Sequence, residues 1–231
     1  MPLELEVSLS DCHLPALSEH PSAASEDALR VAQELFDAAD WAACGVAFDR
    51  VLELGPDANL ARDAAYGAVV CSNNVARDHG SSPAPRGRGR GRDAPAPMPV
   101  DETPEISAFL ARLARGACMM TDRAERAAIA YRRARIYYDR GHAAEAAALF
   151  GRIALGAEPD FAAYGAALWL DSLELLRTRP DSTPGQCESE LRTAAERVTQ
   201  RFCGDLASGE DPGLCRTAAD IRRAIARRDS R

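Results

Sequence analysis

The chain has 231 residues and a formal net charge of −7 at neutral pH. Hydrophobic residues make up 46% of it and charged residues 27%, a balance that is typical of globular proteins and excludes disorder over most of the length. Aromatic residues are scarce at 6% and alanine is abundant, which favours closely packed helices over β-sandwiches and barrels. The acidic balance makes wholesale nucleic-acid binding unlikely, because phosphate groups bind to basic surfaces.

The sequence shows no targeting segment and no membrane-spanning segment. Residues 1–6 have neither the basic start nor the apolar stretch of a secretory signal. No apolar stretch approaches the length that a helix needs to cross a bilayer. We therefore expect a cytoplasmic protein, whereas a true start further upstream would allow a periplasmic one.

Residues 1–24 are predicted to form an N-terminal tail. They contain a short alternating run at 3–7, which could form an edge strand, followed by two prolines. Helical order is expected to begin at Ser25, because serine is a favoured N-cap and the acids Glu26 and Asp27 follow it in the first turn.

Residues 25–58 carry the pattern of two short helices joined by a tight turn. Apolar residues recur every three or four positions on both sides of a break at Ala39 and Asp40. The apolar stripe comprises Leu29, Ala32, Leu35 and Phe36, then Cys44, Ala47, Phe48, Val51 and Leu52. Gly55 and Pro56 end the second helix. An antiparallel helix hairpin is therefore predicted.

The same pattern returns at residues 127–160. Its stripe comprises Ala127, Ala130, Tyr131, Ala134, Tyr137 and Tyr138, then Ala143, Ala146, Ala147, Phe150, Ile153 and Ala154. The two segments match column by column at an offset of 102 residues, as in Ala32 with Ala134 and Phe48 with Phe150. This offset is three times 34, the period of a tetratricopeptide repeat.

These columns resemble the tetratricopeptide repeat family, in which a small residue, an aromatic residue four positions later, a polar turn and a closing proline recur. The first segment reads Ala32, Phe36, Cys44, Phe48 and Pro56, and the later one reads Ala134, Tyr138, Ala146, Phe150 and Pro159. The resemblance implies an all-α fold, an α-solenoid of antiparallel helix hairpins. We expect a first unit and the start of a second over 25–76, further units over 101–179 and a C-terminal helical cap over 180–231.

The resemblance also implies that the first helix of each hairpin lines a concave groove, which binds a peptide or helix of a partner protein. The candidate groove residues are Tyr131, Arg132, Arg135, Tyr138, Asp139 and Trp169. Tyr131 and Arg135 stand one turn apart, so a ring and a guanidinium could together hold a peptide carboxylate. In the alternative interpretation, the tyrosines pack in the core and the arginines are solvated.

Residues 77–100 are rich in proline and glycine and contain an alternating Arg–Gly run at 86–92. They hold too few apolar residues for a core, so we predict a disordered internal loop. The run could bind RNA or another anion through its guanidinium groups. It has no interleaved aromatic residue for base stacking, and a solvated linker is the alternative.

The seven cysteines show no zinc-ligand spacing. Cys44 and Cys71 fall among apolar helical positions, where cysteine is usually a small buried hydrophobic residue. Cys203 ends one predicted helix and Cys215 begins the next. An antiparallel pair of helices would bring their Cα atoms within about 7 Å, close enough for a disulfide, although in the cytoplasm both would be reduced thiols.

The sequence contains no nucleophile elbow, phosphate-binding loop or HExxH motif. His142 with Glu145 could form half of a metal or acid–base site, but no second such pair accompanies it. We expect a non-catalytic adaptor that needs no cofactor and no metal. The alternatives are an RNA- or anion-associated protein acting through the Arg–Gly run, and a cell-envelope assembly component whose signal sequence lies upstream.

Overall fold

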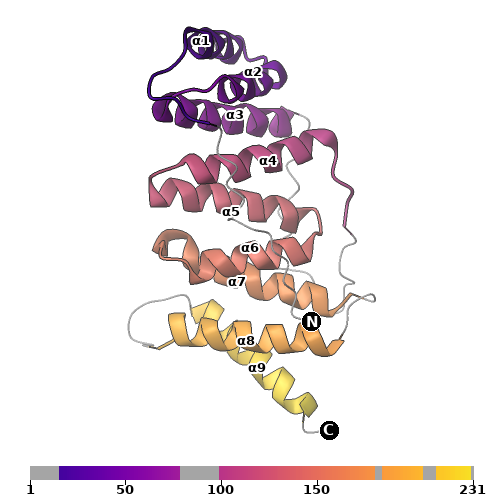
Figure 1. Ribbon diagram of the computed structural model, residues 1–231. Helices are drawn as coiled ribbons and strands as arrows, with labels where there is room; N and C mark the ends of the chain where they lie inside the picture. Colours follow the sequence, from indigo (N-terminus) through magenta and orange to yellow (C-terminus); the bar gives the residue numbers. More distant parts are fainter. Residues whose placement is uncertain (1–15, 79–98, 180–183, 205–211, 230–231) are drawn as a thin grey trace. The chain divides into compact units, whose positions relative to one another are not determined.

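The computed structural model describes residues 16–78, 99–179, 184–204 and 212–229, and within these ranges it consists of nine α-helices and no strand (Figure 1). The expected all-α class is confirmed. The chain divides into two compact units. The N-terminal unit holds described residues 16–78 and 101–133, and the C-terminal unit holds the others, so the boundary falls inside α5 (Arg123–Asp139).

In the N-terminal unit, α1 (Ala23–Asp37), α2 (Trp41–Glu53), α3 (Ala58–Asp78) and α4 (Pro104–Met119) each pack against the next helix in the chain (Figure 1). The core between α1, α2 and α3 comprises Ala32, Cys44, Phe48, Val51, Leu52, Ala61, Ala64, Ala65, Ala68 and Cys71. Alanine supplies half of this set, which lets the helices approach closely. At one point the approach requires glycine, because a Cβ on Gly67 would lie 2.5 Å from the Phe48 ring.

In the C-terminal unit, α6 (Ala143–Leu155), α7 (Pro159–Arg177), α8 (Pro184–Phe202) and α9 (Pro212–Asp229) also pack in chain order. Their shared core comprises Ala147, Ala154, Ala162, Ala166, Leu170, Leu173, Leu191, Ala194, Ala195, Val198, Phe202, Leu214, Ala218, Ile221 and Ile225. The long aliphatic residues come from every helix except α6, which contributes alanine here.

Three helix boundaries recur at the 102-residue offset in the two segments that were predicted to form hairpins. α1 ends at Asp37 and α5 at Asp139, and α2 and α6 begin and end 102 residues apart. Both turns contain the hydrogen-bond pair that closes a helix with a left-handed residue. In the first, the amide of Asp40 donates to the carbonyl of Leu35 (3.0 Å), and in the second that of His142 donates to Tyr137 (2.9 Å).

Burial follows the same register. Pairs that are buried in both segments include Ala32 and Ala134, Cys44 and Ala146, Phe48 and Phe150, Ala64 and Ala166, Ala68 and Leu170, and Cys71 and Leu173. The last three pairs lie on α3 and α7, so the duplication covers three helices. The aromatic column differs, because Phe36 is 36% exposed and Tyr138 only 6%. Between the hairpins the described residues hold one further pair, α3 and α4, and not two consecutive 34-residue repeats.

Two expected helix boundaries were wrong. The first N-cap is Ser22 and not Ser25, which lies fully buried in the first turn of α1 and donates through Oγ to the Ser22 carbonyl, at 2.8 Å. Pro159 begins α7 and does not close the preceding unit, because a proline fits the first turn of a helix, where its missing N–H leaves no bond unmade.

Part of the predicted N-terminal tail is held in place. The amide of Ser18 donates to the Pro56 carbonyl (3.1 Å), and its hydroxyl donates to the Gly55 carbonyl (2.7 Å). These bonds tie residues before α1 to the end of α2. The alternating run at 3–7, for which an edge strand was the alternative to a tail, and the Arg–Gly run at 86–92 lie outside the described residues. α3 extends to Asp78, two residues into the segment expected to be a loop.

The two matched turns differ in the residue that adopts the left-handed conformation, which is Ala39 (φ 56°) in one and Gly141 (φ 83°) in the other. A Cβ in this conformation costs roughly 1–2 kcal/mol, partly offset by the greater unfolded-state entropy of glycine. Ala39→Gly should therefore raise the free energy of unfolding by roughly 0.5–1 kcal/mol, and Gly141→Ala should lower it by about 1 kcal/mol. Urea denaturation of both variants measures this, and effects of the same sign would contradict the assignment.

Candidate functional site

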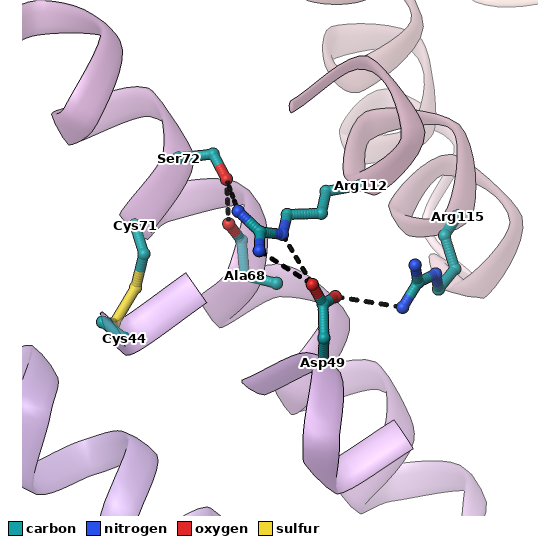
Figure 2. A network of polar contacts seen from close by, with 7 residues as sticks. All are labelled: Cys44, Asp49, Ala68, Cys71, Ser72, Arg112 and Arg115. Atoms are coloured by element: carbon teal, nitrogen blue, oxygen red, sulfur yellow. Dashed lines mark hydrogen bonds and ion pairs between the residues drawn. A yellow bond between two sulfur atoms is a disulfide. The ribbon is translucent and has the colours of Figure 1, made fainter. Parts of the chain in front are cut away.

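Asp49 on α2 is the centre of a polar network that joins three helices of the N-terminal unit (Figure 2). Its Oδ2 lies 2.9 Å from Nε and 2.8 Å from Nη2 of Arg112 on α4. Its Oδ1 accepts a hydrogen bond from Nη1 of Arg115, at 3.0 Å. Nη1 of Arg112 donates to Oγ of Ser72 on α3 (2.6 Å), and Ser72 donates in turn to the Ala68 carbonyl (2.9 Å).

Arg112 is the least exposed charged side chain of this network, at 12%, against 26% for Asp49 and 32% for Arg115. Its guanidinium lies against Gly45 of α2, where a Cβ would be only 2.7 Å from Nη1. Arginine stays protonated in proteins, so two guanidinium groups share one carboxylate and leave a net charge of about +1. This arrangement is suited to holding α4 against α2 and α3, and not to proton transfer.

The C-terminal unit holds a second polar cluster, which links α5 to α7. Arg135 donates through Nη2 to both carboxylate oxygens of Asp139, at 3.0 and 3.3 Å. Its guanidinium carbon lies 5.5 Å from the centre of the Tyr138 ring, within the range of a cation–π contact. The Tyr138 hydroxyl donates to Oδ2 of Asp171 on α7. Burial of the ring, and then this hydrogen bond, raise the pKa of the Tyr138 phenol well above its usual value.

Beside this cluster, α7 presents a partly exposed row of residues, which we call the α7 stripe: Tyr164, Leu168, Asp171 and Leu175. Spacings of three and four residues place them on one face of the helix. Tyr164 is 62% exposed and the two leucines are half-buried. Other residues of α7, among them Ala166 and Leu170, are buried in the core. The stripe is therefore an accessible apolar surface that contains one carboxylate.

The structure brings three of the predicted groove residues together, namely Arg135, Tyr138 and Asp139. The expectation that they lie exposed is not met, since Tyr138 is 6% and Asp139 8% exposed. The Tyr138 ring packs edge-on against Phe150 of α6, with 6.3 Å between centroids. The alternative interpretation, in which this tyrosine is a core residue, describes it better. Arg135 keeps 25% of its side chain exposed.

The remaining predicted groove residues are Tyr131, Arg132 and Trp169. Tyr131 is half-buried and Arg132 exposed, and both belong to the N-terminal unit. There Nη2 of Arg132 donates to Oδ1 of Asn73 on α3, at 2.9 Å. Trp169 is half-buried because its indole covers Gly151 of α6, where a Cβ would lie 3.0 Å from the ring. Its role is packing between α6 and α7.

Two disulfides lie wholly within the described residues, one in each unit. Cys203 and Cys215 are bonded with their Cα atoms 5.7 Å apart, which is the pairing that the sequence favoured. Cys44 on α2 is bonded to Cys71 on α3, with 6.0 Å between Cα atoms (Figure 2). The expectation that Cys44 and Cys71 are ordinary small buried residues was wrong, because the packing of α2 on α3 brings the two side chains face to face.

Sequence reasoning missed the partners of the network and of the cluster. Asp49 and Arg112 are separated by 63 residues, and Tyr138 and Asp171 by 33. The available signal was position: Asp49 directly follows the core residue Phe48, and Asp171 directly follows the core residue Leu170. A charge beside a buried stripe requires a partner, but the sequence does not say which one.

His142 and Glu145 do not form a metal site in the structure. The His142 ring lies edge-on to Tyr137, at 6.0 Å between centroids, and its Nε2 is 2.9 Å from the Val100 carbonyl. In the part of the chain that the structure describes, no group of three or more His, Cys, Asp or Glu side chains is placed to hold a metal ion. Over the same residues, no helix has the length and apolarity needed to cross a membrane.

No protein-family model matches this chain, and no curated protein or solved structure matches it significantly. The class of protein is therefore defined by the fold alone, which is all-helical, with neighbouring helices packed in chain order inside each of two units.

Removing the carboxylate of Asp49 leaves two guanidinium groups side by side without their shared anion. We expect Asp49→Asn to lower the free energy of unfolding by about 2–3 kcal/mol, at or below the low end for a buried ion pair because the site is partly exposed. Glu53→Gln is the matched control, since its pair with Arg50 is about 60% exposed on both sides and should change stability by less than about 0.5 kcal/mol. Equal effects in chemical denaturation would show that the network is unimportant.

The raised pKa of Tyr138 has a consequence at alkaline pH. A phenol that resists ionisation in the folded state contributes stability that is fully present below the unfolded pKa of about 10 and is lost as pH rises towards the folded pKa. An ultraviolet titration of tyrosinate should show a late phase, and Tyr138→Phe should reduce its amplitude by one tyrosine. A late phase that Tyr138→Phe leaves undiminished would contradict the assignment.

Proposed function

We propose that this protein is a non-catalytic helical-repeat adaptor that binds a peptide or helix of another protein along the α7 stripe. The observation that carries the proposal is Tyr164, an aromatic ring that is 62% exposed on a helix that also contributes Ala166 and Leu170 to the core. Exposed aromatic rings give up little conformational entropy when they are covered, which makes them effective anchors in interfaces.

The neighbours of Tyr164 define what such a partner would offer. Leu168 and Leu175 are half-buried, so an apolar side chain laid over them would complete their burial. Asp171 lies between them on the same face, and its Oδ2 is already held by the Tyr138 hydroxyl. A carboxylate held in one position is ready to accept a further hydrogen bond from a backbone amide or a basic side chain. The partner would therefore present apolar residues around one donor.

The internal duplication supports the placement of this chain among helical-repeat proteins. Three successive helices recur with matching buried columns, and the turn between the first two has the same geometry in both copies. Under this proposal the hairpins are of the tetratricopeptide type and stack as a solenoid, with α5 and α7 as successive first helices. Repeat arrays of this kind generally offer extended surfaces for protein partners.

A second candidate is an assembly factor of the cell envelope. Its support comes from the paired cysteines, because disulfides persist in oxidising compartments and are rare in the cytosol. This setting is compatible with the adaptor role. The third candidate, binding of RNA or another anion, depends on the Arg–Gly run at 86–92, which lies outside the described residues.

Site-specific photo-crosslinking tests the adaptor proposal. A photoreactive residue at position 164 should capture a partner in the host cell, and one at position 66 provides the matched control. Tyr66 is also an exposed tyrosine, at 54%, but it lies on α3 of the other unit. Capture at 66 and not at 164 would contradict the assignment to the α7 stripe.

The substitution Tyr164→Ala provides a second measurement on the captured partner. It should lower affinity by tenfold or more, as expected for an aromatic anchor worth over about 1.4 kcal/mol. Its effect on stability should stay within about 0.5 kcal/mol, because the ring is exposed. An unchanged affinity would show that the ring is not part of the interface.

A further inference from the structure

We infer that Cys44 and Cys71 are a site of oxidative modification, and that the chain acquires this disulfide during folding in an oxidising compartment. The inference is independent of the adaptor proposal. It departs from the cytoplasmic location that the start of the sequence favoured, and it concerns when and where the N-terminal unit becomes stable.

Most cysteines of the described residues are paired. The described residues include six cysteines, and five of them are bonded: Cys44 to Cys71, Cys203 to Cys215, and Cys118 as well. Only Cys187 is a free thiol among them. In a protein whose thiols stay reduced, we would not expect facing pairs of cysteines in both units. A framework with bonded cysteines in both units is typical of proteins that fold where thiols are oxidised.

Burial of Cys44 and Cys71 determines when their bond can form relative to the packing of α2 on α3. Cys44 and Cys71 have no exposed surface, and they lie among Ala32, Phe48 and Ala68 in the core of α1, α2 and α3. No oxidant reaches these sulfur atoms once the helices have closed. The bond must therefore form before or while α2 docks on α3. Cys203 and Cys215 are only partly buried and remain within reach of solvent after folding.

The chemistry requires an exchange partner that is itself a disulfide. The thiolate of one cysteine attacks that disulfide and forms a mixed disulfide, and one sulfur of the partner leaves as a thiolate. The thiolate of the second cysteine then attacks the chain's own sulfur in the mixed disulfide, forms the Cys44–Cys71 bond and releases the partner's other sulfur as a thiolate. The chain loses two electrons and two protons, and the partner gains them. An oxidised dithiol catalyst or glutathione disulfide meets this need.

The position of the bond gives it a role in the Asp49 network. Cys71 directly precedes Ser72, which accepts a hydrogen bond from Arg112, and Cys44 lies on the helix that carries Asp49 (Figure 2). The bond holds α3 beside α2, so that Ser72 and Asp49 face the same guanidinium. Oxidation therefore fixes in advance the two groups to which α4 must dock.

Cys187 is the residue that could disturb this pairing by thiol exchange. It is 6% exposed, and burial raises the pKa of its thiol, with Glu190 adding to the effect. Because only the thiolate attacks a disulfide, a buried thiol with a raised pKa exchanges slowly. Cys187 thus provides an internal control, a cysteine of the same chain that should remain a thiol.

The test uses the full chain produced once in a reducing cytosol and once with export to an oxidising compartment. Each sample is denatured in the presence of an alkylating reagent and mapped by mass spectrometry without reductant. The exported protein should yield linked peptides for 44–71 and 203–215 and an alkylated Cys187. Cys44 and Cys71 recovered as alkylated thiols from folded, exported protein would overturn the inference.

The order of reduction gives a second readout that needs no variant. Mild reductant added to the native, exported protein should open Cys203–Cys215 first and leave Cys44–Cys71 intact until the protein unfolds. Complete reduction should lower the melting temperature by on the order of 10 °C. Cys44→Ala with Cys71→Ala should show a smaller fall on reduction, whereas Cys187→Ala should behave as wild type. A wild-type melting temperature unchanged by complete reduction would overturn the inference, whether or not the double variant folds.

Discussion

The carboxylate of Asp49 is shared between two guanidinium groups, and the order of the N-terminal unit depends on this arrangement. Arg112 can be 88% buried only because Asp49, Ser72 and the bare backbone of Gly45 receive it from two other helices. A buried cation without an anion is strongly destabilising, so α4 has one position on α2 and α3 that satisfies it. The small alanine side chains of the core would allow these helices to pack in several registers, and the Asp49 network selects one of them.

In the C-terminal unit, different interactions determine the register in which the helices pack. Its core has long aliphatic residues on α7, α8 and α9, whose interdigitation already defines a register. Its polar cluster places the Tyr138 phenol between Phe150 and Asp171. The cluster orients the exposed carboxylate of Asp171, and for this reason we propose a partner-binding surface in this unit and not beside Asp49.

The covalent and the ionic connections of the N-terminal unit act in sequence. A disulfide between α2 and α3 limits the freedom of the unfolded chain before α4 is in place. The ion pairs of Arg112 and Arg115 then hold α4 on the surface that α2 and α3 have already formed. A protein with a core made largely of alanine buries little apolar area per residue, so such connections matter more for it than for a chain of the same length with a leucine-rich core.

The sequence by itself determined the all-helical class, the two hairpins and the columns of small and aromatic residues that they bury, because helical periodicity and turn chemistry are local properties. It also placed Cys203 beside Cys215, since a short connection between two helices constrains their ends. It could not pair Cys44 with Cys71 or Asp49 with Arg112, because these contacts depend on which helix faces lie opposite one another. For the same reason Tyr138 could be a groove residue or a core residue until α6 and α7 were packed against it. Only the tertiary structure decided these contacts, since burial and charge pairing are properties of helices packed together and not of any one helix.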